Sequence, residues 1–215
     1  MRQHGLLAPR RLGHPHGDPA HAGTIVTDLP AVMWGTDATR FYTAQDGWCW
    51  VFGAIDHGTD EIVGWHATKI GDRWAALEAL RQGVRYAFGG FGKEIARGLT
   101  LRCDWGPQYT ADVWIGEVRW LGMAISPAYV GEPECNGVKR FMRTLQEQCL
   151  YLHQFASLAE ARRVIGAFVH RYNTEWLIAR LGYRTPSAAR AAAWAAAGVT
   201  MLTSCPGNRA RYRLC

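Results

Sequence analysis

The 215-residue sequence lacks features that mark several classes of protein. Its six cysteines include no C-x-x-C pair, which argues against a zinc ribbon or a redox motif, and a chain of this length does not need a disulfide scaffold. No apolar run reaches the roughly eighteen uncharged residues of a membrane span, and the N-terminal segment has no apolar core of a signal peptide. We therefore expect a protein of the reducing cytoplasm with no membrane partner.

Lysine is also scarce: three of the 24 basic residues are lysine, and the rest are arginine. Against 18 acidic residues this gives a net charge of +6 and a pI near 9.2. The modest excess is compatible with a polyanion partner, but a GC-rich genome that encodes arginine in place of lysine explains it equally well. Because 48% of the residues are hydrophobic and ten are tryptophan, most of the chain should fold around a buried core.

Composition divides the chain into four parts. Residues 1–29 are rich in Pro, Gly, His and Arg and predict a basic linker. Its histidines favour a solvated arm over a metal cluster, because no cysteine or carboxylate set completes them. Residues 30–155 should form the main core, 156–197 its C-terminal helices, and 198–215 a loose basic tail.

The pattern of the core predicts an α/β fold with a mixed five-stranded sheet flanked by helices. Three strands come first and are expected as an antiparallel meander, followed by strands that alternate with helices. The expected strands are 32–37, 47–56, 61–66, 99–104 and 123–126. The expected helices begin after Asp72, at Val113, after Asn136, near Leu158 and at Thr185-Pro186.

Two aspartates, Asp37 and Asp104, are predicted at the ends of separate strands. Neighbouring strands can hold two carboxylates a few ångströms apart, and such like charges repel unless a cation lies between them. Hard oxygen ligands suit Mg²⁺ or Mn²⁺, which can activate water or a 3′ hydroxyl for phosphodiester chemistry. On spacing alone, a role as turn or cap residues is the more ordinary interpretation of both. Asp56, at the end of another strand, is interpreted as a turn former.

Several motifs, in one order, resemble the integrase catalytic core of bacterial insertion-sequence transposases, the retroviral-integrase-like kind. The resemblance covers about residues 25 to 190. It is carried by Trp34–Thr39, Ile55–His57 with Ile62–Trp65, Asp104–Tyr109, Leu121-Gly122 with Ser126-Pro127, Gly131–Gly137, Arg140–Leu145, and Tyr172-Asn173 with Leu181–Pro186.

The resemblance implies a ribonuclease-H-like fold and a triad of acids that binds two divalent metal ions, Mg²⁺ or Mn²⁺. It implies DNA cleavage and strand transfer, with Asp37 and Asp104 as the first two acids. It also implies DNA as partner, both element ends and target, with a homo-oligomer or an intact transposase subunit, and a place at the bacterial nucleoid. Residues 1–29 would then be the remnant of an upstream DNA-binding region. The expected DNA contacts are Gln108, Tyr109, Asn136, Arg140 and Arg143, with Arg162 and Arg163 on the next helix.

The third acid of the family is missing. Its position falls on Lys139, and the segment from Asn136 to Lys139 is one residue short of the family pattern. A unit charge about 4 Å from another is worth about 4 kcal/mol at an effective dielectric constant of 20, so a cation in place of an anion should oppose metal binding. Glu134 in the preceding loop is the candidate substitute, whereas Glu147 lies eight residues, or about 12 Å, along the helix.

Three functions therefore remain open. The chain is a transposase or integrase core with impaired catalysis, a non-catalytic remnant that binds DNA or a transposase subunit, or a ribonuclease-H-like nuclease that works with one metal ion. The residue at the third acid position distinguishes them.

Overall fold

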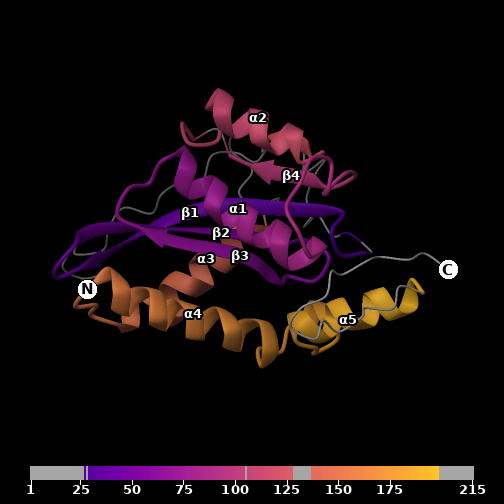
Figure 1. Ribbon diagram of the computed structural model, residues 1–215. Coiled ribbons are helices and arrows are strands. Elements are labelled where there is room, and N and C mark those ends of the chain that lie inside the picture. The colour runs from indigo at the N-terminus through magenta and orange to yellow at the C-terminus, as the bar shows by residue number, and fades with distance from the viewer. Residues whose placement is uncertain (1–26, 28, 105, 128–136, 199–215) are drawn as a thin grey trace, which may run out of the picture.

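The structure is a computed structural model that describes residues 27, 29–104, 106–127 and 137–198. Five strands form one mixed sheet in the order β3-β2-β1-β4-β5 (Figure 1). The first three strands pair antiparallel, whereas β4 and β5 run parallel to β1. The predicted mixed five-stranded sheet is confirmed. The strands are β1 (Met33–Thr43), β2 (Gly47–Asp56), β3 (Ile62–Thr68), β4 (Thr100–Cys103) and β5 (Ala124–Pro127).

Helices cover both faces of the sheet. Because side chains alternate along a strand, Trp34 of β1 lies in the apolar cluster under α1 and α2, and Phe41 lies in the cluster under α3 and α4. The result is three layers, with α4 running along one side of the molecule (Figure 1). The helices are α1 (Arg73–Phe88), α2 (Asp112–Trp120), α3 (Gly137–Gln148), α4 (Leu158–Thr174) and α5 (Pro186–Ala196), with short 3₁₀ turns η3 (Leu150–Leu152) and η4 (Ala179–Leu181).

Polar caps begin the helices where the sequence predicts them. The Asp72 carboxylate accepts hydrogen bonds from the backbone N–H groups of Trp74 and Ala75, both at 3.0 Å. The Thr185 hydroxyl accepts one from Ala188 N at 3.2 Å, with Pro186 as the first helical residue. No helix in the described part of the chain is both long and apolar enough to cross a bilayer.

Three details differ from the sequence prediction. Asp37 does not end its strand, because β1 continues to Thr43 and pairs with β2 in a long hairpin. Apolar spacing in the sequence predicts that the helix after Asn136 continues to Leu152, but α3 ends at Gln148 and Leu152 is 67% exposed. The apolar spacing after Asp72 predicts that Trp74 faces inward, but this residue lies in the first turn of α1 and is 52% exposed.

The turn between β2 and β3 holds the C-terminal segments. Glu61 is fully buried and accepts hydrogen bonds from Tyr86, Ser187 and Arg190. Asp60 forms a 2.7 Å ion pair with Arg180. These contacts fix α5 and the segment before it to the hairpin, since each buried carboxylate needs its partners.

Candidate metal and nucleic-acid site

The two aspartates predicted as metal ligands, Asp37 and Asp104, are brought together on neighbouring strands. The parallel register of β1 and β4 pairs Gly35 with Arg102. Two residues further along both segments stand Asp37 and Asp104, so the period of two puts both side chains on the same side of the sheet. Asp104 directly follows β4 and accepts a hydrogen bond from Gly106 N at 2.9 Å.

The carboxyl group of Asp37 lies in an environment that disfavours its charge. Burial raises the pKa of Asp37 from 3.8 to about 6, although Ala38 N donates a 2.8 Å hydrogen bond to its carboxylate and lowers it. The charge of Asp104 raises this pKa further, and the charge of Lys139 lowers it. Two close carboxylates in a half-buried position concentrate negative potential, which attracts a cation.

Helix α3 covers this part of the sheet closely. Gly53 is the β2 partner of Asp37, and a Cβ at that position would lie 2.9 Å from the methyl carbon of Met142. Further along the helix, the Gln146 side chain donates a hydrogen bond to the hydroxyl of Thr39. The helix is therefore fixed over β1 by contacts beyond Asp37.

Lys139 stands in the first turn of this helix and acts on Asp37 as a nearby positive charge. A protonated lysine offers no electron pair to a metal ion and repels it. Asp37 and Asp104 are suitable ligands for one hard divalent ion. Among the described residues no group of three His, Cys, Asp or Glu could hold a metal ion. The donor set fits two ligands of one ion and falls short of a three-acid centre.

Comparisons with known proteins show what this chain is similar to. The family described as "Integrase core domain" matches residues 121–186. The chain is 25% identical over 175 residues to the transposase for insertion sequence element IS629 of Shigella sonnei, covering 81% of this chain and 56% of that protein. It is 28% identical over 160 residues to the transposase for IS904 of Lactococcus lactis, covering 73% and 60%. This chain is therefore similar to insertion-sequence transposases and to an integrase core domain. It spans little more than half the length of these relatives.

Solved structures confirm the predicted ribonuclease-H-like fold. A chain of the simian T-cell lymphotropic virus intasome, solved with PP2A regulatory subunit B56 gamma, superposes with a TM-score of 0.65 at 12% identity, over 82% of this chain and 60% of that one. The HTLV-2 integrase catalytic core domain in complex with magnesium gives 0.54 at 15% identity, over 75% and 97%. At such identities the likeness concerns the fold.

Tyr109 is not available for the DNA contact that the resemblance implies. It is 2% exposed, and its ring packs edge-on against Trp114 at 5.3 Å between centroids. Burial raises the pKa of Tyr109 well above its usual value. In this structure Tyr109 supports the loop after Asp104 from within. Its burial contradicts the DNA contact predicted for its side chain. The neighbouring Gln108 is partly exposed and stays a candidate.

The predicted basic contacts on α3 are exposed. Arg140 and Arg143 both face solvent, and Arg143 forms a 2.7 Å ion pair with Glu147. That pair turns Glu147 away from the role of a third acid. On α4, Arg162 and Arg163 are also exposed, and Arg162 donates to Ala67 O at 2.9 Å. The predicted Asn136 contact and the candidate substitute Glu134 lie outside the described residues.

Asp56 has the structural role predicted from its position. It is 2% exposed and accepts hydrogen bonds from Ala31 N, Trp34 Nε1 and Gly58 N at 2.6, 3.0 and 2.9 Å. All its partners belong to the hairpin turn or the start of β1. Burial nonetheless raises the pKa of Asp56.

Sequence analysis missed Arg102, which is 6% exposed and lies two residues before Asp104. Its Nε has no hydrogen-bond partner in the part of the chain that the structure describes. Nothing in its sequence context separates it from the many surface arginines. Strand alternation puts it on the face opposite Leu101 and Cys103, which lie in the α1 and α2 core, but its burial on that face depends on the tertiary packing.

Proposed function

We propose that this integrase core binds DNA and performs divalent-metal-dependent cleavage and strand transfer only poorly. The observation that supports the proposal is the convergence of Asp37 and Asp104 beneath a helix whose first turn carries Lys139. The DNA would comprise element ends and target. A second copy of the chain, or a complete transposase subunit, would be the protein partner.

Lys139 weakens the site in two ways. It removes a third anionic ligand and adds a positive charge where a divalent ion would sit. At an effective dielectric constant of 20, each unit charge about 4 Å from the ion is worth about 4 kcal/mol per charge pair, so the exchange reverses a favourable contribution. A lysine in the first turn also opposes the helix dipole, which favours an acid there.

The residues that would hold a divalent ion are Asp37 and Asp104. When bound, such an ion supplies activation of a water or 3′ hydroxyl and charge stabilisation at the phosphodiester. The chain holds both carboxylates in fixed positions. Asp37 lies within a strand that is paired with β2, and Asp104 accepts a hydrogen bond from the Gly106 N–H. Lys139 would instead neutralise part of the acid pair when the ion is absent.

The test compares the unmodified chain with two variants in Mg²⁺ or Mn²⁺. One variant carries Lys139→Glu with the missing residue restored before it, and the other carries Asp37→Asn. Nicking and strand transfer are measured on a duplex that bears the element's ends. We expect activity in the repaired variant at least about 100-fold above that of the unmodified chain, because the third ligand returns.

Other outcomes would indicate a different function or reject the proposal. Robust cleavage by the unmodified chain that Asp37→Asn abolishes would indicate a nuclease that works with one metal ion. DNA binding without activity in any variant would indicate a remnant that only binds. Failure of the unmodified chain to bind duplex DNA would reject the proposal.

A further inference from the structure

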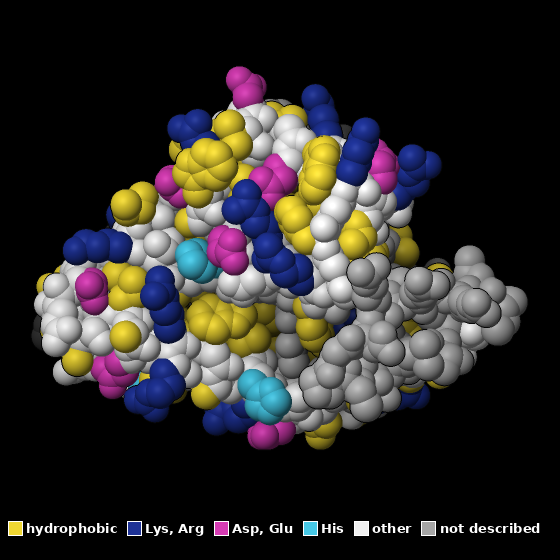
Figure 2. Space-filling model, in the orientation of Figure 1, with side chains coloured by type: hydrophobic (Ala, Val, Ile, Leu, Met, Phe, Trp, Pro, Cys, Tyr) yellow, Lys and Arg dark blue, Asp and Glu magenta, His cyan; other side chains and the backbone are white. Residues whose placement is uncertain are grey.

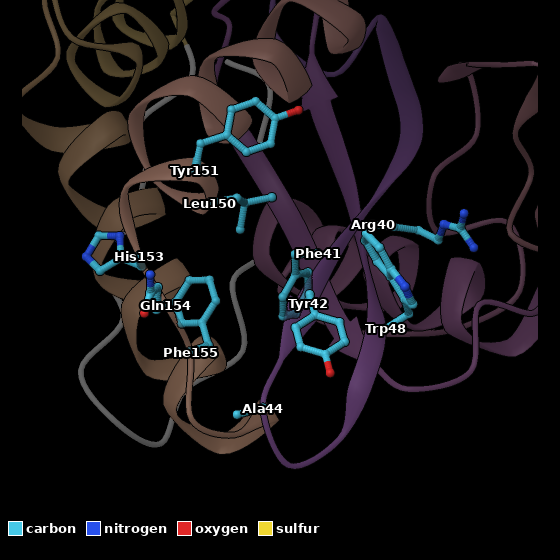
Figure 3. A pocket seen from close by; sticks show the side chains of 10 residues that line it. All are labelled: Arg40, Phe41, Tyr42, Ala44, Trp48, Leu150, Tyr151, His153, Gln154 and Phe155. Atoms are coloured by element: carbon cyan, nitrogen blue, oxygen red, sulfur yellow. The ribbon is translucent and has the colours of Figure 1, made fainter.

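A groove of about 460 Å³ opens at the far end of β1. One wall comes from the β1–β2 hairpin, with Arg40, Tyr42 and Trp48, and the other from the segment after α3, with Tyr151 and Phe155 (Figure 3). Three of the aromatic side chains that line the groove are open to solvent: Tyr42, Trp48 and Tyr151 are 57%, 59% and 70% exposed. Large aromatic side chains left this exposed, and close together, mark a binding surface.

The aromatic walls have fixed positions. Tyr42 and Trp48 are cross-strand partners in the hairpin, and their rings meet edge-on at 5.7 Å. The guanidinium of Arg40 lies 5.3 Å from the ring centres of both Trp48 and Trp50. On the opposite wall, Phe155 is hydrogen-bonded through its backbone oxygen to Ala44 N at 2.9 Å. The surface is therefore built in advance of any ligand.

One edge of β1 connects this groove to the acid pair. On that edge β1 pairs with β4 only from Met33 to Gly35, and it meets Phe155 only at Thr43. Among the described residues no strand pairs with the stretch between. Asp37 stands at one end of this open stretch and Arg40 to Tyr42 at the other, three to five residues away. That is about 10–17 Å of strand, roughly the rise of three to five stacked nucleotides.

The chemistry of the groove selects the ligand. Flat aromatic rings and an arginine plane stack on nucleobases, and each such contact is worth about 1–3 kcal/mol for single-stranded nucleic acid. None of the ten residues that line the groove is acidic, and Arg40 provides a positive charge for a phosphate. A protein partner would also find an apolar surface here, but it would not require the arginine between two tryptophan rings.

We propose that this groove binds unpaired nucleotides of the DNA strand that runs from the acid pair along the open edge of β1. The inference rests on the proposed function, since it needs DNA at Asp37 and Asp104. It adds a preference for frayed or single-stranded DNA next to the reacting phosphate. Trp48 and Tyr151 stack on the bases. Arg40 packs over the ring of Trp48 and supplies the positive charge for a phosphate of the DNA backbone.

The experiment measures binding of fluorescent oligo(dT) and of a blunt duplex of random sequence by anisotropy. Trp48→Ala and Tyr151→Ala should each weaken oligo(dT) binding about 5- to 100-fold and leave blunt-duplex binding within about twofold. Trp74→Ala is the matched control, because Trp74 is similarly exposed but lies on α1 outside the groove. Unchanged thermal unfolding of each variant shows that the fold is intact.

Equal oligo(dT) binding by the Trp48 and Trp74 variants overturns the proposal, as does a wild-type chain that binds no oligo(dT). Sedimentation that shows loss of a dimer in the groove variants, with oligo(dT) binding unchanged, assigns the groove to a second copy of the chain instead. The two proposals can fail separately. If the groove variants lose oligo(dT) binding but the chain repaired at Lys139 still transfers no strands, the groove proposal holds and the proposed function fails.

Discussion

At the scale of single residues, Asp37 works against the stability of the fold. Its carboxyl is half-buried near Asp104, and burial raises its pKa to about 6. A raised folded-state pKa means that the contribution to stability is complete below the unfolded pKa of about 4 and is lost as pH rises through 6. At neutral pH the ionised Asp37 therefore lowers the free energy of unfolding, and a bound cation would offset this loss.

Asp37→Asn should stabilise the metal-free chain at neutral pH. In EDTA, the variant's advantage in free energy of unfolding should grow by roughly 1–3 kcal/mol between pH 4 and pH 8, because the penalty appears only when Asp37 ionises. Urea unfolding at both pH values measures it. Asp112→Asn removes the same charge from an exposed position and should not reproduce this growth. A difference that shrinks with rising pH would contradict the argument.

At the scale of elements, the sheet and α1 meet through glycine. Gly64 of β3 lies directly against the backbone of α1, and a Cβ there would collide with Ala79 O and lie 2.6 Å from Gly83 N. Backbone atoms cannot move aside as a flexible side chain can. The close contact fixes the distance between β3 and α1, and with it the core around Trp34, which also contacts Gly83.

Gly64→Ala should therefore destabilise the chain by roughly 2–4 kcal/mol through overpacking. Gly116→Ala is the matched control in the interior of α2, where nothing lies within 4 Å of the added Cβ. There the same change should stabilise by about 0.5–1 kcal/mol, since alanine has the higher helix propensity. Midpoints of urea unfolding test both, and equal effects of the two substitutions would show that the contact is not tight.

The β2–β3 turn and α5 form the second element contact of interest. Glu61 is 0% exposed and pairs with Arg190, itself 8% exposed, at 3.3 Å. The guanidinium also lies 4.6 Å from the ring centre of Tyr86. Burial and the adjacent Glu61 raise the pKa of Tyr86 to about 12, so its hydroxyl remains a donor to Glu61 at neutral pH.

Arg190→Met should cost about 3–5 kcal/mol, because it leaves the charge of Glu61 buried without its cation. The double variant Glu61→Gln, Arg190→Met removes both charges and should recover much of that loss. Chemical unfolding of the wild-type chain, the single variants Glu61→Gln and Arg190→Met, and the double variant measures the coupling. If the double variant is as unstable as the sum of its parts, the two side chains are energetically independent.

At the scale of the whole molecule, the relevant property is how the net charge of +6 is distributed. On the face shown in Figure 2, lysine and arginine side chains are interspersed with acidic and hydrophobic ones and do not gather into one patch. A net charge of +6 on such a surface supports weak, salt-sensitive attraction to DNA with little sequence readout.

The logarithm of the association constant for duplex DNA should fall linearly with the logarithm of the salt concentration, with a slope of about −0.9 per phosphate contact. Arg143→Ala should reduce the slope by about one unit if Arg143 contacts a phosphate. Arg97→Ala is the matched control, because Arg97 is also 78% exposed and also paired with a nearby glutamate, Glu94. Identical slopes for the two variants would exclude Arg143 from the interface.

Local sequence signals predicted the elements well because they act over a few residues. Alternation and apolar spacing found the strands and helices, and Asp72 and Thr185 marked helix starts. They failed where an element's end depends on a distant partner. β1 passes Asp37 because β2 pairs with it to Thr43, and Leu152 is exposed because α3 ends before it, at Gln148.

The sequence alone determined which residues could carry the chemistry: two aspartates, and a lysine where an acid is expected. Only the tertiary structure decided which of them meet. Register between β1 and β4 brought Asp37 and Asp104 together, and packing buried Tyr109. Within the described ranges, no strand pairs with the edge of β1 that lies between Asp37 and the aromatic groove. Chemical identity is local to each residue, whereas proximity depends on strand pairings between segments far apart in the chain.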